Sequence, residues 1–307
     1  MRELLHELGR IAADQHGAFN RVQALDAGAN DNDLAVWVQQ GAVRRDGHGV
    51  YCFSGAPRTW LQSVRVATLE AGRHAVASCE TALALWDIED VPHDEPHIAI
   101  PRGLNHRIGP ATTHEMRDLD EARVTVRYGI PVTGVLRAVL DDAMTAPLGT
   151  VKRRLESARR RYDISAPAAV DAIRRHARPG RTGIRKFRQA VVHEYAHRAN
   201  DSRFEHDANE ILRRAGVLGG QSRFRTLFRD GTPVEFDIAW PEVRVAVELV
   251  GGDHFRRRRV MLSDLVRRNR ANLDEWLILE FDYDLVIGSP EIFVAQVLQA
   301  LALRSAA

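Results

Sequence analysis

Two acidic residues stand within apolar sequence near the carboxyl end of the chain. Asp237 lies in PVEFDIAW and Glu248 in VRVAVELV, and both segments have the apolar content of buried strands. Burying an unpaired carboxylate is costly, so each acid needs a partner. Carboxylates from adjacent strands can share one Mg²⁺ or Mn²⁺ ion, which polarises a phosphodiester and activates water. We therefore predict that Asp237 and Glu248 are metal ligands and catalytic residues.

Three further residues have side chains that would assist hydrolysis. Glu205 would supply a third oxygen, His254 would carry a proton, and Asp264 would orient it. Each also has a structural interpretation. Ser202 and Glu205 form a capping-box pattern, a lone histidine is often structural, and Asp264 is typical of a helix start. Both interpretations stay open.

Arginines surround these acids in the sequence. The run at 256–259 is either a phosphate-facing loop or a solvated one, and two arginines follow Asp264 at helical i+3 and i+4 spacing. In the catalytic interpretation these side chains bind DNA. The predicted contacts from this region are Arg256, Arg257, Arg258, Arg267 and Arg268.

The elements that must position the acids follow the order α-β-β-β-α-β-α. Hydrophobic periodicity with glycine and proline breaks predicts them. They are a helix at 202–216, strands at 222–228, 233–240 and 243–250, a helix at 263–273, a strand at 276–282 and a helix at 290–303.

The spacing of these residues resembles a known family. The pattern comprises SxxE, DIAWP, VExxGxxH, DxxR and a tryptophan before the last strand, over residues 202–303. It is similar to Vsr-like domains of unknown function in the PD-(D/E)XK endonuclease superfamily. The resemblance implies a restriction-endonuclease-like α/β core that binds magnesium. It assigns Asp237 and Glu248 as metal ligands, Glu205 as the helix acid and His254 as an acid/base group.

Val250 departs from that family's pattern. Relatives usually carry aspartate two residues after the strand glutamate, where other superfamily members have lysine. The last 121 residues contain no lysine. Either His254, Asp253 or Glu235 compensates, or the chain cleaves poorly or not at all.

The amino-terminal residues predict a winged helix-turn-helix. Helical patterns at 3–13, 20–26 and 31–40 precede VRRDGHGVYCF, which predicts a hairpin around an Asp-Gly turn at 46–47. The third helix would enter a DNA major groove, with Arg44, Arg45 and His48 near phosphates. Such modules also dock proteins. Residues 1–53 look like the AbiEi-like winged-helix antitoxin domain.

The middle of the chain is mixed and ends in a basic stretch. It predicts a helix at 60–71, a strand-turn-helix or second helix in AVASCETALALW, a strand pair at HIAIPRG and ARVTVRYG, and a helix at VLRAVLDDAM. Residues 152–188 hold thirteen basic and three acidic side chains. This excess is either a nucleic-acid footprint or a solvated helical face.

Length and composition set the remaining expectations. The 307 residues predict an α/β protein, α+β overall, with domains at 1–55, 56–198 and 199–307. Two cysteines exclude a disulfide framework, and the absence of an apolar run or signal sequence predicts a cytoplasmic protein without a membrane span.

Two functions remain open. The first is a Mg²⁺- or Mn²⁺-dependent DNA endonuclease. The second is a catalytically impaired DNA-binding regulator or antitoxin, whose nuclease fold serves as a scaffold. Its partner would be a toxin or a second copy of the chain.

Overall fold

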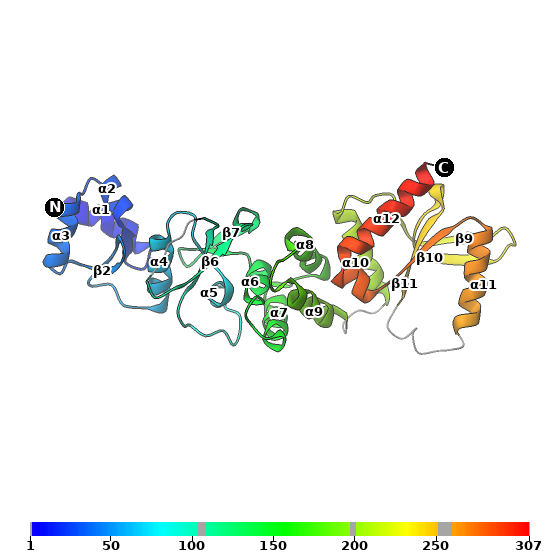
Figure 1. The fold of residues 1–307 in the computed structure, drawn as a ribbon, viewed down its shortest axis with the longest axis horizontal. Helices are drawn as coiled ribbons and strands as arrows, with labels where there is room; N and C mark the ends of the chain where they lie inside the picture. Colours follow the sequence, from blue (N-terminus) through cyan, green and yellow to red (C-terminus); the bar gives the residue numbers. More distant parts are fainter. Residues whose placement is uncertain (1, 104–108, 197–200, 251–259, 307) are drawn as a thin grey trace. The chain divides into compact units, whose positions relative to one another are not determined.

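The computed structural model describes residues 2–103, 109–196, 201–250 and 260–306. The chain divides into two compact units, Met1–Arg161 and Tyr162–Ala307. Both contain helices and sheets, so the α+β class is confirmed (Figure 1). Residues 162–198, assigned to a middle domain from the sequence, cluster with the second unit. The division into three domains stays a prediction.

The first unit begins with the element order of a winged helix. Its three strands form an antiparallel sheet in the order β1-β3-β2. Phe19, Leu34 and Trp37 are fully or almost fully buried between the helices and this sheet. The elements are α1 (Arg2–Ala13), β1 (Ala18–Asn20), α2 (Arg21–Asp26), α3 (Asp31–Gln39), β2 (Val43–Gly47) and β3 (Val50–Phe53).

Local signals account for these boundaries, with one correction. Asn20 and Asn30 each begin a helix through a capping box, as polar side chains do when they satisfy free backbone N–H groups. The predicted hairpin turn at 46–47 is wrong, because Asp46 and Gly47 belong to β2 and Gly47 pairs with Val50. The turn is His48-Gly49, where φ of Gly49 is +67°. This left-handed conformation costs glycine little.

The rest of the first unit surrounds a five-stranded sheet in the order β6-β5-β4-β8-β7. Helix α4 matches its prediction at both ends. The predicted pairing of HIAIPRG with ARVTVRYG is wrong, because β5 pairs with β4 and β6 while β7 pairs with β8. The elements are α4 (Trp60–Ala71), β4 (Val76–Ala77), α5 (Cys79–Leu85), β5 (His97–Pro101), β6 (Thr112–Met116), β7 (Val124–Arg127), β8 (Ile130–Thr133), α6 (Val135–Asp142) and α7 (Leu148–Tyr162).

The second unit contains the predicted α-β-β-β-α-β-α order. Its sheet runs β12-β11-β10-β9, antiparallel except for the parallel pair β11 and β12, which α11 connects. The elements are α8 (Ala166–His176), α9 (Ile184–Ala196), α10 (Asp201–Arg214), β9 (Gln221–Leu227), β10 (Pro233–Trp240), β11 (Val245–Val250), α11 (Val260–Leu273), β12 (Leu277–Asp282) and α12 (Pro290–Ser305).

Helices cover both faces of this sheet. Figure 1 shows α11 on one side and α10 with α12 on the other. Ala271 of α11 packs into an apolar cluster with Ala239, Ala246 and Trp276. The three alanines let α11 approach the strands that carry the two acids. Among the described residues, no helix has both the length and the hydropathy needed to cross a bilayer.

Candidate active site

Asp237 and Glu248 come from neighbouring antiparallel strands. Ile238 pairs with Val247 and Ala239 with Ala246, so continuing the register by one residue puts Asp237 opposite Glu248. Directly opposed residues share a face of the sheet. The Asp237 carboxylate reaches across to β11, where the Leu249 backbone N–H donates to its Oδ2 at 2.7 Å. The register and the electrostatic effect of Asp237 on Glu248 place the two acids near each other on one face of the sheet.

Both carboxyl groups are protonated more readily than usual. Glu248 is 8% exposed, and loss of water raises its pKa to about 7. Arg267 opposes this shift, and the negative charge of Asp237 adds to it. Burial also raises the pKa of Asp237, with a further contribution from Glu205. The acids thus form a partly buried cluster of mutually repelling charges.

Helix α11 provides cations to this cluster. Arg267 forms an ion pair with Glu248, with 3.1 Å between Nη1 and Oε1. Arg268 pairs with Glu280 of β12, the register partner of Glu248. Both arginines were predicted to contact DNA. Either one would have to exchange a carboxylate for a phosphate in order to do so.

Glu205 approaches the cluster from α10. Its carboxylate pairs with Arg223 of β9 at 2.7 Å, and its charge raises the pKa of Asp237. Glu205 is therefore near the other acids, as the catalytic interpretation requires. In the part of the chain that the structure describes, however, oxygens of the three acids do not all lie within 4.8 Å of one another.

The remaining predicted catalytic and arginine positions are not placed. His254, Arg256, Arg257 and Arg258 lie outside the described residues, and Asp264 lies in α11 without a described side chain. Val250, the departure from the family pattern, pairs in register with Asp282 of β12. Asp282 accepts a hydrogen bond from the Leu285 backbone N–H at 2.8 Å.

The donor set suits a hard divalent cation. Asp237 and Glu248 offer oxygen ligands, which Mg²⁺ and Mn²⁺ prefer. Their raised pKa values reflect lost hydration and mutual repulsion, both of which a cation would relieve. Arg267 and Arg223 now provide part of that compensation. Arg267 contacts Oε1 of Glu248, so a cation would either share this carboxylate with Arg267 or displace it.

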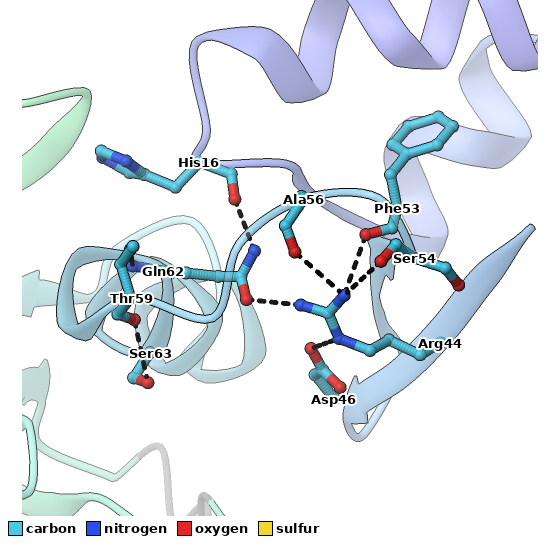
Figure 2. A network of polar contacts seen from close by, with 9 residues as sticks. All are labelled: His16, Arg44, Asp46, Phe53, Ser54, Ala56, Thr59, Gln62 and Ser63. Carbon is cyan, nitrogen blue, oxygen red and sulfur yellow. Dashed lines mark hydrogen bonds and ion pairs between the residues drawn. The ribbon is translucent and has the colours of Figure 1, made fainter.

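The wing of the first unit contains the three other predicted DNA contacts. Figure 2 shows Arg44 directed into the protein, where it donates to Asp46, to Gln62 and to the backbone oxygens of Phe53, Ser54 and Ala56. Its side chain is 17% exposed. These contacts give Arg44 a structural role, so we do not propose that it contacts DNA.

Arg45 and His48 are exposed at the end of the same hairpin. Arg45 makes long contacts of 3.4 Å to the Gly47 oxygen and 3.5 Å to His48 Nδ1. Such contacts are weak. Both side chains are free to approach a phosphate.

The basic stretch is partly neutralised within the fold. Arg154 is buried between Glu80 and Asp142, Arg160 pairs with Glu89, and Arg188 pairs with Glu291. It also spans both compact units. Its net charge therefore overstates the positive surface that it offers.

Sequence reasoning missed a second cluster, in the first unit. Ligand atoms of Cys79, His97 and His114 all lie within 4.8 Å of one another. No short motif marks them, since they come from a helix start and two strands.

No protein-family model matches the chain, and no curated protein matches it. Among solved structures, the chain is similar to the RV2827C protein from Mycobacterium tuberculosis, with 12% sequence identity and a TM-score of 0.43. The match covers 68% of this chain and 81% of that chain. A similarity at this level supports no argument about family or activity.

Proposed function

We propose that the protein is a DNA-binding, Mg²⁺- or Mn²⁺-dependent endonuclease that hydrolyses phosphodiester bonds. The observation that carries this proposal is the convergence of Asp237 and Glu248, both partly buried, on one face of the second unit's sheet. The resemblance to the PD-(D/E)XK superfamily supports it. So does the α-β-β-β-α-β order around the two acids.

The chain's own residues have separate tasks in this proposal. Asp237 and Glu248 would hold the cation, which polarises the scissile phosphate and lowers the pKa of the attacking water. Glu205 approaches from α10 and keeps the local potential negative. Arg223 has a 54% exposed side chain, and Arg267 a 37% exposed one. Both can move from a carboxylate to a phosphate and orient the substrate.

The first unit supplies the binding surface. In a winged helix the recognition helix enters the major groove, and the wing contacts the backbone. Helix α3 would take the first role, and Arg45 with His48 the second. Phosphate contacts of this kind position a duplex and carry little sequence information.

A cleavage assay tests the proposal. The full chain is incubated with single- and double-stranded DNA and Mg²⁺, Mn²⁺ or EDTA. We expect metal-dependent products that disappear in Asp237→Asn and Glu248→Gln. The matched control is Glu242→Gln, an exposed acid in the turn between the same two strands, and it should keep full activity. Cleavage that persists in both site variants would remove these acids from the chemistry.

A second function is favoured by two specific observations. Val250 replaces the family's aspartate, and arginines already neutralise Glu205 and Glu248. A regulator or antitoxin would bind DNA with strong salt dependence. It would not cleave DNA, whichever metal is added. Its partner would be a toxin or a second copy of the chain. DNA binding by the wild type without products under Mg²⁺ or Mn²⁺ would favour this alternative.

A further inference from the structure

Three side chains that bind metals in other proteins meet in the first unit. Cys79 begins α5, His97 begins β5 and His114 lies in β6, next to β5 in the sheet. His97 Nδ1 and His114 Nε2 are 3.1 Å apart, and the two rings stack with centroids 5.2 Å apart. The Cys79 Sγ completes a group whose ligand atoms all lie within 4.8 Å.

The separation of the nitrogens matches that of two ligands on one ion. Ring nitrogens bound to Zn²⁺ at about 2.0–2.1 Å lie roughly 3.3–3.4 Å apart at a tetrahedral angle. The observed 3.1 Å is close to this value. One thiolate and two imidazoles also form a donor set that favours zinc over magnesium.

The backbone at Cys79 is held in an unusual conformation. Its φ is +48°, which non-glycine residues rarely adopt, and the residue is 2% exposed. Such conformations persist only when the surrounding structure imposes them, and they often occur at functional sites. Here the conformation brings Sγ to the two histidines.

Acidic side chains lie near the cluster, each paired with a buried arginine: Arg154 with Glu80 and Asp142, and Arg137 with Asp141. Asp142 is fully buried, and its Oδ1 accepts from Arg154, but its Oδ2 accepts no hydrogen bond. Asp142 acts electrostatically on both His97 and Cys79. Burial and the charges of Asp141, Asp142 and Glu80 raise the pKa of the Cys79 thiol.

We propose that Cys79, His97 and His114 bind one divalent transition-metal ion of the zinc class, with a water molecule as the fourth ligand. The ion ties the start of α5 to β5 and β6 and stabilises the first unit. This site is separate from the oxygen site at Asp237 and Glu248 and does not depend on the proposed nuclease.

Cobalt absorption tests the site directly. The full-length protein, stripped of metal and kept reduced, is titrated with Co²⁺. We expect a thiolate-to-cobalt charge-transfer band that saturates at one equivalent and is displaced by Zn²⁺. Saturating Zn²⁺ should also raise the unfolding temperature by roughly 5–10 °C. A wild-type protein that shows neither the band nor the thermal shift would overturn the proposal.

Matched variants assign the ligands. Cys79→Ser should remove the band, and His114→Gln should weaken Co²⁺ binding roughly tenfold or more. Cys52→Ser replaces the other buried cysteine, and His74→Gln replaces an exposed histidine of the same unit. Both should bind like the wild type, as should Asp237→Asn. An unchanged band in Cys79→Ser, or its loss in Cys52→Ser alone, would refute the assignment. So would unchanged binding in His114→Gln.

Discussion

Glu248 shows how one buried carboxylate is balanced by several partners. Loss of water and the charge of Asp237 favour its protonated form, whereas Arg267 favours its ionised form. The balance leaves its pKa at about 7. A proton and Arg267 therefore compete for this carboxylate. In the proposed function a divalent cation would compete with both, so binding of the metal would depend on pH.

The raised pKa predicts how stability depends on pH in EDTA. In the folded protein Glu248 binds its proton more tightly than in the unfolded chain, where the reference value is 4.5. Its contribution to stability is complete below pH 4.5 and is lost as the pH rises through about 7. The shift corresponds to at most about 3 kcal/mol. Glu248→Gln cannot ionise and should lack this loss.

Urea unfolding at pH 5 and pH 8 checks this prediction. Between these values the wild type should lose about 2–3 kcal/mol more of its free energy of unfolding than Glu248→Gln loses. Glu242→Gln should follow the wild type. Equal losses in the wild type and Glu248→Gln would contradict a raised pKa at this position.

Val250 gives a second prediction at the residue scale. It lies in β11, two residues beyond Glu248, on the same side of the strand by alternation. Val250→Asp would introduce the acid that the Vsr-like domains carry at the corresponding position and add a carboxylate to the cluster. We expect tighter Mn²⁺ binding, by roughly tenfold, measured by calorimetry. Unchanged affinity in a folded Val250→Asp variant would contradict a metal at this face. A valine-to-aspartate change elsewhere in β11, such as Val245→Asp, cannot serve as the control for this measurement, because Val245 is fully buried.

At the scale of the elements, Arg44 connects β2 to α4 through hydrogen bonds, whereas the neighbouring Arg45 makes no such connection in the described residues. Arg44 joins the wing to Gln62 of α4, and Gln62 in turn donates to the His16 backbone oxygen at 2.6 Å (Figure 2). Arg44→Ala removes the donor to Asp46 and to Gln62 Oε1 and should cost about 2–3 kcal/mol. Arg45→Ala, the adjacent exposed arginine, should change stability by less than about 0.5 kcal/mol. Urea unfolding measures both. Equal costs would contradict the structural role.

The sequence predicted elements well where periodicity and breaks coincide. PVEFDIAW forms β10 with the predicted ends, and Asn20 begins α2. Prediction failed where the outcome depended on distant partners. One of the two neighbours of β5 is β6, a polar strand (TTHEM) with no apolar alternation. The two acids could be anticipated because burying charge is costly. The orientation of Arg44 could not, since Arg45 has the same side chain.

The Cys79 cluster was missed for a similar reason. His97 and His114 meet because β5 and β6 are parallel neighbours. Parallel strands need a long connection, so no short turn in the sequence indicates that the two strands pair. No spacing rule relates the two histidines to the cysteine at the start of α5. Metal motifs are recognised from sequence when their ligands are local, as in zinc fingers.

For the whole molecule, the proposed function puts the wing contacts to DNA and the hydrolytic acids in different compact units. The wing residues Arg45 and His48 belong to the first unit, and Asp237 with Glu248 to the second. Electrostatic binding to phosphates releases counterions, so the slope of log K against log salt reports the number of contacts. Substitutions in the wing should therefore change the salt dependence of DNA binding, and substitutions of the two acids should change cleavage.

Salt titrations of DNA binding by the full chain, in EDTA, test this separation. Arg45→Ala should weaken binding to all sequences and reduce the magnitude of the slope by about 1, because one phosphate contact is lost. Asp237→Asn should leave the slope unchanged while abolishing cleavage in metal. If Arg45→Ala keeps the wild-type slope, Arg45 does not contact the DNA backbone. If Arg44→Ala reduces the slope in a folded protein whereas Arg45→Ala does not, the inward orientation of Arg44 cannot describe the bound state.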